Sequence, residues 1–285
     1  MDRRIFLKTI GSWAGPMIAA GPLRAAESAL TYESIGVLVD ESRCVGCRKC
    51  EIACAEAHNL PRPELTEAAL FRRQRTTTEV QLTVVNGYPG ANDEEFFAKR
   101  QCMHCLQPAC VSACLTEAMH MTKTGAVVWD ASKCMGCRYC MLSCPFDAPK
   151  FEYHKAVPSI RKCDFCWDRL QKGLQPACVE ICPAKVMLFG RRTELLEVAR
   201  ARIYGHPEEY IHHIYGEHEA GGTRWLYIAP VSFSRLGFRA DVGNVSYPEY
   251  TEQFLYSVPL VLILLPVLLL ALNKATEPER VDDAV

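Results

Sequence analysis

The sequence lacks an excess of charge of either sign. It contains 32 Lys and Arg residues against 33 Asp and Glu residues, and its formal net charge at pH 7 is -1. Proteins that bind nucleic acid or another polyanion usually carry a strongly basic face, and this composition gives no reason to expect one. We therefore predict no nucleic-acid partner.

Long hydrophobic runs are also missing, with one exception near the C-terminal end. Residues 254–272 read FLYSVPLVLILLPVLLLAL and contain neither a charge nor a histidine. As a helix this run reaches about 28 Å, close to the bilayer core of about 30 Å. A buried core helix is the alternative, but a helix that is apolar all round needs protein on every side. We predict a transmembrane helix at 254–272, without a haem ligand, and a cytoplasmic tail at 273–285.

The first residues, MDRRIFLK, contain an arginine pair that resembles the twin-arginine export signal. A modestly apolar run follows over residues 9–20, too short to span a bilayer. The alternative is a chance arginine pair in a cytosolic N-terminus. We predict a signal peptide at 1–26, export in the folded state, and a location on the periplasmic side of the cytoplasmic membrane.

Cysteine is absent before residue 44 and after residue 182, although the chain contains sixteen cysteines. Between these limits the cysteines form four groups of four, and such regular grouping is typical of metal ligation. The groups comprise Cys44, Cys47, Cys50 and Cys54 (group one); Cys102, Cys105, Cys110 and Cys114 (group two); Cys134, Cys137, Cys140 and Cys144 (group three); and Cys163, Cys166, Cys178 and Cys182 (group four).

The spacing within the groups is that of iron–sulfur ligands. Groups one and three follow the pattern C-x2-C-x2-C-x3-C of bacterial ferredoxins, in which three thiolates wrap one cluster and the fourth binds a neighbouring cluster. Groups two and four keep the first and last steps and lengthen the middle one. Pro108 and Pro176 each precede the third cysteine by two residues, which predicts equivalent loops in these two groups.

Zinc and disulfides are the competing explanations for these cysteines. Four-thiolate zinc sites also use paired C-x2-C motifs, but they lack the final Cys-Pro step that groups three and four carry at Pro145 and Pro183. Disulfides would require oxidation before a folded export, which the N-terminal signal argues against. Iron–sulfur clusters are therefore the favoured interpretation.

The four groups can pair as neighbours or with one pair nested inside the other. Only residues 115–133 separate groups two and three, and residues 125–129 read as a short strand between them. This compact spacing is typical of one two-cluster ferredoxin unit and favours nesting. Residues 76–85 alternate in polarity and predict a further strand in the interval between groups one and two.

Three segments, CMHCLQPACVSAC, KCMGCRYCMLSCPFDAPKFEY and RKCDFCWDRLQKGLQPACVEICPAKVMLFG, resemble the four-cluster subunits of dimethyl sulfoxide reductase, formate dehydrogenase and nitrate reductase complexes. The similarity covers about residues 36–192. Within this superfamily the sequence is similar to the ferredoxin-type subunits of membrane-bound, hydrogenase-2-type nickel–iron complexes, which share the twin-arginine start, the helical stretch RTELLEVARARI, the segment IYGEHEAGGTRWLYI and a single C-terminal anchor.

The resemblance implies nested ligation. It also implies four [4Fe-4S] clusters and no [3Fe-4S] cluster, because no cysteine of any group is replaced. Ala55 and Leu115 follow the fourth cysteines of groups one and two, where ferredoxins often have proline, which puts the local turns in question. The implied ligands are Cys44, Cys47, Cys50 and Cys182 (set one); Cys163, Cys166, Cys178 and Cys54 (set two); Cys102, Cys105, Cys110 and Cys144 (set three); and Cys134, Cys137, Cys140 and Cys114 (set four).

The fold implied is α+β, with two nested bacterial 2[4Fe-4S] ferredoxin-like modules, added strands and one C-terminal transmembrane helix. The outer module comes from groups one and four, and the inner module covers about residues 95–155. The predicted divisions are a signal peptide at 1–26, the four-cluster domain at 36–192, a C-terminal extension at 193–250, the membrane helix at 254–272 and the tail at 273–285.

Other polar residues carry weaker signals. His104 lies between two cysteines of group two and could ligate a cluster, but because four thiolates complete a cluster's ligands, we expect it to pack or to form a hydrogen bond. The basic residues Arg72, Arg73 and Arg75 predict a solvated face, with a docking surface for a partner as the alternative.

No motif for a nucleophile, base or substrate pocket accompanies the cysteines, which indicates an electron-transfer subunit without catalysis of its own. The resemblance implies a relay from a periplasmic catalytic subunit, with nickel–iron hydrogenase favoured, to a quinone-linked integral membrane subunit. The alternatives are the same relay in a formate dehydrogenase, a molybdopterin reductase or another quinone-linked complex. A catalytic subunit in its own right and a structural zinc protein are the other classes.

Overall fold

A computed structural model describes residues 34–66, 70–71, 74–90 and 94–276. The predicted signal peptide lies outside these residues, as does the tail beyond residue 276. The strands are β1 (Ile35–Asp40), β2 (Thr83–Pro89), β3 (Glu95–Gln101), β4 (Met119–Met121), β5 (Val127–Trp129), β6 (Lys150–Phe151), β7 (Ile160–Arg161), β8 (Met187–Arg191) and β9 (Trp225–Ile228). The helices are α2 (Lys49–Ala57), α4 (Ala109–Ser112), α5 (Tyr139–Leu142), α6 (Trp167–Leu170), α7 (Ala177–Glu180), α8 (Arg192–Gly205) and α9 (Tyr247–Thr276), with short 3-10 helices η2 (Glu41–Arg43), η3 (Ala131–Lys133) and η4 (Glu219–Gly221).

A three-stranded sheet, in the order β8-β1-β9, joins the start of the described residues to their later part. β1 pairs antiparallel with β8, with Val37 opposite Phe189, and parallel with β9, with Val37 opposite Trp225. Because β1 is the central strand, both of its backbone edges are hydrogen-bonded. The residues of the predicted C-terminal extension thus contribute β9 to the same sheet that carries β1.

The two faces of this sheet pack against different parts of the molecule. Successive side chains of a strand point to opposite faces. Leu38 and Leu226 pack with the apolar side of α8, including Leu195. Val37 and Trp225 pack on the other face, in a core that contains cysteines of groups one and four. The sheet therefore separates α8 from the cysteine-bearing loops.

The β2–β3 hairpin follows group one in the chain. Thr83 lies opposite Gln101 and Pro89 lies opposite Glu95. The predicted strand at 76–85 was placed too early, because β2 begins at Thr83 and residues before it form only an isolated bridge between Thr78 and Gln81. By contrast, the strand predicted at 125–129 is present as β5, which pairs with β4.

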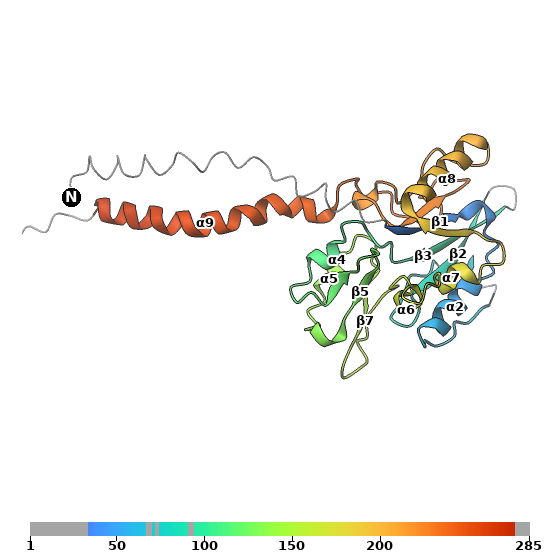
Figure 1. Cartoon of the computed structure of the whole chain (residues 1–285), viewed down its shortest axis with the longest axis horizontal. Coiled ribbons are helices and arrows are strands. Elements are labelled where there is room, and N and C mark those ends of the chain that lie inside the picture. Colours follow the sequence, from blue (N-terminus) through green and yellow to red (C-terminus); the bar gives the residue numbers. More distant parts are fainter. Residues whose placement is uncertain (1–33, 67–69, 72–73, 91–93, 277–285) are drawn as a thin grey trace, which may run out of the picture.

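The helices that carry the cysteines pack in two pairs. α2, from group one, packs against α7, from group four, and α4, from group two, packs against α5, from group three. The short sheets β4-β5 and β6-β7 lie in the segments around groups two and three. Figure 1 shows α4, α5, β5 and β7 together in one lobe, while α2, α6 and α7 lie together in another.

α9 is a long apolar helix that projects away from the other described residues (Figure 1). It contains Pro259 and Pro266, and its apolar side chains are exposed. By length and composition it is the one helix among the described residues that is able to cross a membrane. The predicted span, 254–272, lies inside it, and α9 contacts α4.

Candidate iron–sulfur centre

All four cysteine groups share one backbone feature immediately before their second cysteine. The residue there has a positive φ in every group: 64° at Gly46, 48° at His104, 74° at Gly136 and 65° at Phe165. The left-handed conformation reverses the chain within a few residues and is costly for any residue other than glycine. Its repetition, at two non-glycine residues as well, indicates that the four loops are built for one purpose.

The third cysteine of each group is the second residue of a helix. Cys50, Cys110, Cys140 and Cys178 follow the first residues of α2, α4, α5 and α7 respectively. The left-handed turn and the helix start therefore fix the first three cysteines of each group in a tight loop. This local geometry matches the need of a cubane cluster for three thiolates from one short segment.

The two missing prolines have different outcomes. Ala55 lies inside α2, which continues past Cys54 to Ala57 because no proline ends it. Leu115 follows Cys114 in the turn after α4, which ends at Ser112 without a proline. In both cases the cysteine before the missing proline, Cys54 or Cys114, still lies among cysteines of another group.

The cysteines predicted for set one lie around a single cavity. Its lining includes Cys44, Cys47, Cys50 and Cys182, together with Lys99. Cys182 reaches this cavity from group four because α7 packs against α2. A cavity lined by four thiols from two loops fits a cubane cluster, for which thiolate is the usual ligand.

The inner cysteines of sets three and four are gathered in the same way. The pKa of Cys140 is raised to about 11, first by burial and then by the neighbouring thiols of Cys114, Cys134 and Cys137. These are the members predicted for set four.

The cysteines predicted for set three also lie close to one another. The pKa of Cys105 is raised well above its ordinary value, first by burial and then by the thiols of Cys144, Cys102 and Cys110.

The remaining set draws on both outer groups. The pKa of Cys163 is raised by burial and by the thiols of Cys102, Cys54 and Cys166. Cys54 also adds to the raised pKa of Cys178, for which burial is the largest cause. Cys54, from group one, thus lies among the cysteines of group four.

Burial of these thiols bears on their chemistry. A thiol whose pKa is raised by burial is not a free nucleophile at neutral pH. A bound metal removes this barrier, because the metal charge stabilises the thiolate. All sixteen cysteines are free of disulfides, and only Cys47 and Cys137 are exposed. The thiols whose pKa is raised by burial therefore suit metal ligation better than nucleophilic catalysis.

The spread of the thiols distinguishes clusters from zinc. A tetrahedral zinc site with Zn–S bonds of about 2.3 Å holds its sulfurs about 3.8 Å apart. Across the described residues, which include every cysteine, no three Sγ atoms lie within 4.8 Å of one another. This spacing is wider than that of an assembled four-thiolate zinc site.

Two buried lysines accompany the cysteines. Lys99, on β3, is 2% exposed, and Lys162, immediately before Cys163, is 7% exposed. Burial alone lowers the pKa of Lys99, but the thiols of Cys178 and Cys50 outweigh this effect and raise it. No sequence pattern indicates these residues, because a single lysine in a strand usually marks a solvated face.

His104 is fully buried and neutral. Burial, followed by the charge of Lys162, holds its pKa well below the ordinary value. Its Nδ1 accepts a hydrogen bond from the Val127 N–H at 3.0 Å, and its ring meets Phe165 edge to face at 4.8 Å. The predicted packing and hydrogen-bonding role of His104 is confirmed, and it links the two lobes.

A second histidine, not predicted, joins groups one and four. His58 Nε2 lies 2.8 Å from Asp164 Oδ1, and the same oxygen accepts the Cys166 N–H at 2.8 Å. His58 Nδ1 lies 3.8 Å from the Cys54 sulfur. The ion pair thus orients cysteines of both outer groups at their junction.

The prediction of a solvated face at the basic residues was wrong for Arg75. Its guanidinium contacts the buried carboxylate of Glu51 at 2.8 Å, and Arg48 contacts the same carboxylate at 2.9 Å. Arg72 and Arg73 lie outside the described residues. Spacing in the sequence does not reveal that a carboxylate on α2 lies opposite this arginine.

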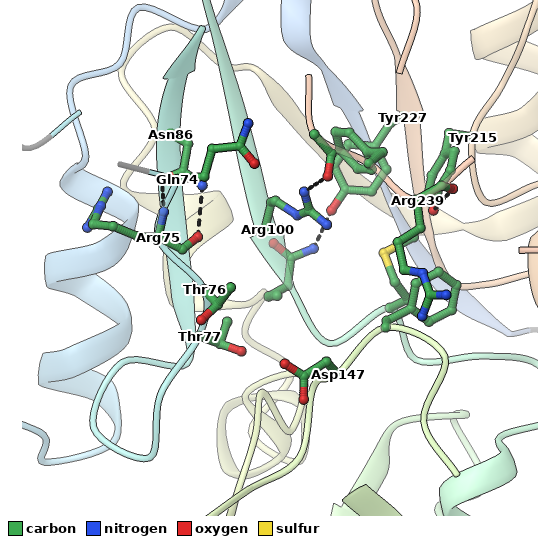
Figure 2. A pocket seen from close by; sticks show the side chains of 15 residues that line it. Gln74, Arg75, Thr76, Thr77, Asn86, Arg100, Asp147, Tyr215, Tyr227 and Arg239 are labelled. Atoms are coloured by element: carbon green, nitrogen blue, oxygen red, sulfur yellow. Dashed lines mark hydrogen bonds between the residues drawn. The ribbon is translucent and has the colours of Figure 1, made fainter. Parts of the chain in front are cut away.

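A separate cavity of about 250 Å³ lies between the hairpin and the C-terminal segments (Figure 2). Its cationic side chains are already paired: Arg75 with Glu51, Arg239 with Asp241, and Arg100 with the Gly237 carbonyl. No cysteine lines it. It is a polar seam between packed segments, and its lining offers no nucleophile with an activating base.

The loops, thiols and spacing together define the chain as a ferredoxin-type iron–sulfur protein. Comparison with known proteins agrees. The 4Fe-4S dicluster domain matches residues 94–192, and the 4Fe-4S binding domain matches residues 37–60.

Three relatives span much of the chain. A protein of Nitratidesulfovibrio vulgaris is 45% identical over 279 residues, which covers 94% of this chain and 75% of the relative. The hydrogenase-2 operon protein HybA of Escherichia coli O157:H7 is 32% identical over 294 residues, covering 90% of both proteins. The B subunit of the anaerobic dimethyl sulfoxide reductase of Escherichia coli K12 is 39% identical over 160 residues, covering 56% of this chain and 75% of the relative.

The chain therefore belongs to the HybA-type family of iron–sulfur electron-transfer subunits. It relays electrons and is not the catalytic subunit of an oxidoreductase.

Proposed function

We propose that the chain holds four [4Fe-4S] clusters, one in each of the four sets, and relays electrons between a catalytic subunit and the membrane. When bound, such clusters take up and release electrons at potentials set by burial and hydrogen bonds. The observation that carries the proposal is the cavity lined by Cys44, Cys47, Cys50 and Cys182.

Nested pairing is supported by the helix contacts. Pairing of neighbours would bring α2 against α4 and α5 against α7. The observed packing is α2 against α7 and α4 against α5. Two nested ferredoxin-like modules account for this packing directly.

The sets follow one another in a line. Cys44 and Cys50, from set one, share a core with Cys178, from set two. Cys163, from set two, packs with Cys102 and Cys144, from set three.

Sets three and four also adjoin each other. Cys110, from set three, packs with Cys140, Cys114 and Cys134, from set four. Electrons can therefore pass from set one to set four, or in reverse, through adjoining sites.

The two ends of this line reach the surface. Cys47, in set one, and Cys137, in set four, are the exposed cysteines. Each has an exposed apolar residue two positions before it, Val45 and Met135. The set four end lies in the lobe where α4 contacts α9, so it faces the membrane side. The set one end then faces the catalytic partner.

The catalytic partner that we favour is a periplasmic nickel–iron hydrogenase. The reason is that the relative HybA is named as a hydrogenase-2 operon protein and its similarity covers 90% of this chain. Electrons would leave toward a quinone-linked integral membrane subunit beside α9. Export in the folded state by the twin-arginine route would place the domain on the periplasmic side. A molybdopterin reductase partner is the second candidate, because identity to the B subunit of dimethyl sulfoxide reductase reaches 39%.

Iron analysis and cysteine variants test the clusters. Anaerobically purified full-length protein should contain about sixteen irons per chain. Nested ligation predicts that Cys182→Ser and Cys44→Ser disturb the same cluster signal in electron paramagnetic resonance, whereas pairing of neighbours predicts that Cys182→Ser matches Cys134→Ser. About half the iron, or a Cys182→Ser spectrum identical to wild type, would refute the proposal.

Copurification tests the partner. The protein is extracted from membranes in a mild detergent, and the metals and companion subunits are identified. Stoichiometric nickel in the complex supports the hydrogenase, whereas molybdenum with a molybdopterin subunit supports the reductase and refutes our favoured partner.

A further inference from the structure

Lys99 and Lys162 are buried cations without a carboxylate partner. Burial of an ammonium ion is costly, and buried lysines are usually paired. No carboxylate of the described residues lies within 4.0 Å of either ammonium group. Their hydrogen bonds go to neutral acceptors only. A negative charge nearby would offset the cost of burying them.

The side chain of Lys99 lies between sets one and two. Its ammonium donates to Gln101 Oε1 at 2.6 Å and lies 4.4 Å from the centre of the Trp225 ring. It lines the set one cavity together with Cys50. Cys50, from set one, packs in the same core as Cys178, from set two.

Glu41 is the carboxyl group beside this lysine. It accepts the backbone N–H of Lys99, not the ammonium, at 3.1 Å. Its second carboxyl oxygen is buried without a hydrogen-bond partner. An oxygen in that position fits a protonated carboxyl group, which carries no charge to neutralise Lys99.

Lys162 occupies the corresponding place between sets two and three. Its ammonium donates to the carbonyls of Val127 at 2.5 Å and of Cys163 at 2.9 Å. Lys162 thus contacts the backbone of Cys163, from set two, and Cys163 packs with Cys102 and Cys144, from set three. The neighbouring Asp164 is already paired with His58 at 2.8 Å.

We propose that Lys99 and Lys162 are fixed counter-charges between successive clusters, which raise the reduction potentials of the clusters on either side. The inference rests on the proposed four-cluster function. Lys99 acts on sets one and two, and Lys162 acts on sets two and three. Set four has no buried lysine of this kind among the described residues and serves as an internal reference.

The physical reason is the charge of the clusters. A cubane core of charge +2 with four thiolates has a net charge of -2, and each added electron makes it more negative. An ammonium ion in a low-dielectric interior stabilises the reduced form more than the oxidised one. Placed between two clusters, it also reduces the repulsion when both hold an electron. One electron leaves one site and enters the next, with no bond or proton transferred.

A purely structural role is the alternative. In that case the lysines serve as hydrogen-bond donors to Gln101 and to backbone carbonyls, and their charge has no specific effect on the potentials. The two explanations differ in which clusters respond to removal of the charge, so a potential measured for each cluster separates them.

The test is a redox titration of the anaerobically purified full-length protein, followed by electron paramagnetic resonance. The variants are Lys99→Met and Lys162→Met, with exposed Lys172→Met as the matched control. One Cys→Ser variant in each set, at Cys44, Cys178, Cys102 and Cys134, assigns each signal to its set. We expect Lys99→Met to disfavour reduction of sets one and two by about tenfold or more, which is about 59 mV for one electron. Lys162→Met should do the same to sets two and three.

The charge-preserving variants Lys99→Arg and Lys162→Arg should keep the wild-type order of potentials. If Lys99→Met fails to incorporate clusters, Lys99→Gln and Lys162→Met decide the question. Unchanged potentials in fully loaded Met variants, or an equal shift of all four signals, would overturn the inference. Absence of four cluster signals in the wild-type protein would instead refute the proposed function.

Discussion

Single residues set the geometry of the cysteine loops. The left-handed position before the second cysteine is filled by glycine in groups one and three and by His104 and Phe165 in groups two and four. The two aromatic rings meet edge to face, so their packing offsets the backbone strain. Glycine at the other two positions avoids the strain but contributes no side chain of its own.

The two glycines should differ in their tolerance of substitution. A methyl group at Gly46 would overlap the ring of Phe97, whereas a methyl group at Gly136 meets no atom within 4 Å. Both variants carry the left-handed penalty of about 1–2 kcal/mol. We expect Gly46→Ala to lose its clusters at a clearly lower temperature than Gly136→Ala, as measured by visible absorbance on heating. Equal loss in the two variants would show that the steric overlap is relieved freely.

Glu41 predicts a pH effect on stability. Burial raises the pKa of its carboxyl group from 4.5 to about 8, against the opposing effect of Lys99. Between these values the folded protein holds a proton that the unfolded chain has released, so this group makes stability fall as pH rises.

Glu41→Gln should remove this contribution. The variant protein should show a flatter dependence of unfolding free energy on pH between about 5 and 8, measured anaerobically by denaturant titration. The control is the exposed Glu56→Gln on α2. If wild type and Glu41→Gln have the same slope, Glu41 is already ionised in the folded protein.

Residue types with a strict spacing were readable from the sequence, and isolated ones were not. The positions of the sixteen cysteines could be interpreted from the sequence because ligand chemistry imposes their spacing. Lys99, Lys162 and His58 have no such pattern. Their roles depend on which distant segments surround them, as when Asp164 meets His58.

At the level of elements, one buried carboxylate joins three segments. Glu51, on α2, accepts hydrogen bonds from Arg48, Arg75, Gln81 and the N–H of Val85. Burial opposes ionisation, but the two arginines outweigh it and lower the pKa of Glu51. The carboxylate therefore fixes the segment before β2 onto the helix that carries Cys50.

Glu51→Ala should destabilise the protein by about 3–5 kcal/mol, because it leaves buried arginines without their partner. The measurement is the midpoint of denaturant unfolding, with cluster content recorded in parallel. Replacement of exposed Glu56 by Ala, on the same helix, should change it little. A small effect of Glu51→Ala would mean that water or another acceptor replaces the carboxylate.

Elements governed by local signals were predicted, and those governed by distant pairing were not. α8 coincides with the stretch named in the sequence, and β5 appears between groups two and three. β2 begins later than predicted because its register is set by β3. The place of β9 beside β1 depends on a parallel pairing that no local pattern specifies.

On the scale of the whole molecule, α9 separates an electron-transfer body from a long apolar stem. Exposed leucines cover this helix, and its apolar stretch is not buried against the other described residues. A charge near its middle is opposed by about 3 kcal/mol on membrane insertion scales.

Leu264→Arg should therefore move a substantial share of the protein from the membrane fraction to the soluble fraction. Leu264→Val is the matched control and should stay with the membrane. Fractionation after a high-salt wash, with immunodetection of the full-length chain, provides the measurement. Full retention of Leu264→Arg would indicate that partner subunits, not α9, hold the protein at the bilayer.

The overall arrangement was only partly readable. The apolar run and the cysteine groups predicted an anchored α+β iron–sulfur protein, and the described structure agrees at that level. The contact between α4 and α9, which orients the line of cysteines, arises from packing that the sequence does not encode locally.

The central position of β1 has a consequence for biosynthesis. This strand is made early, yet both strands that hydrogen-bond to it, β8 and β9, are made late. A nascent chain that stops before Met187 leaves two open backbone edges and is exposed to aggregation and proteolysis. Completion of translation thus becomes a condition for a protected sheet.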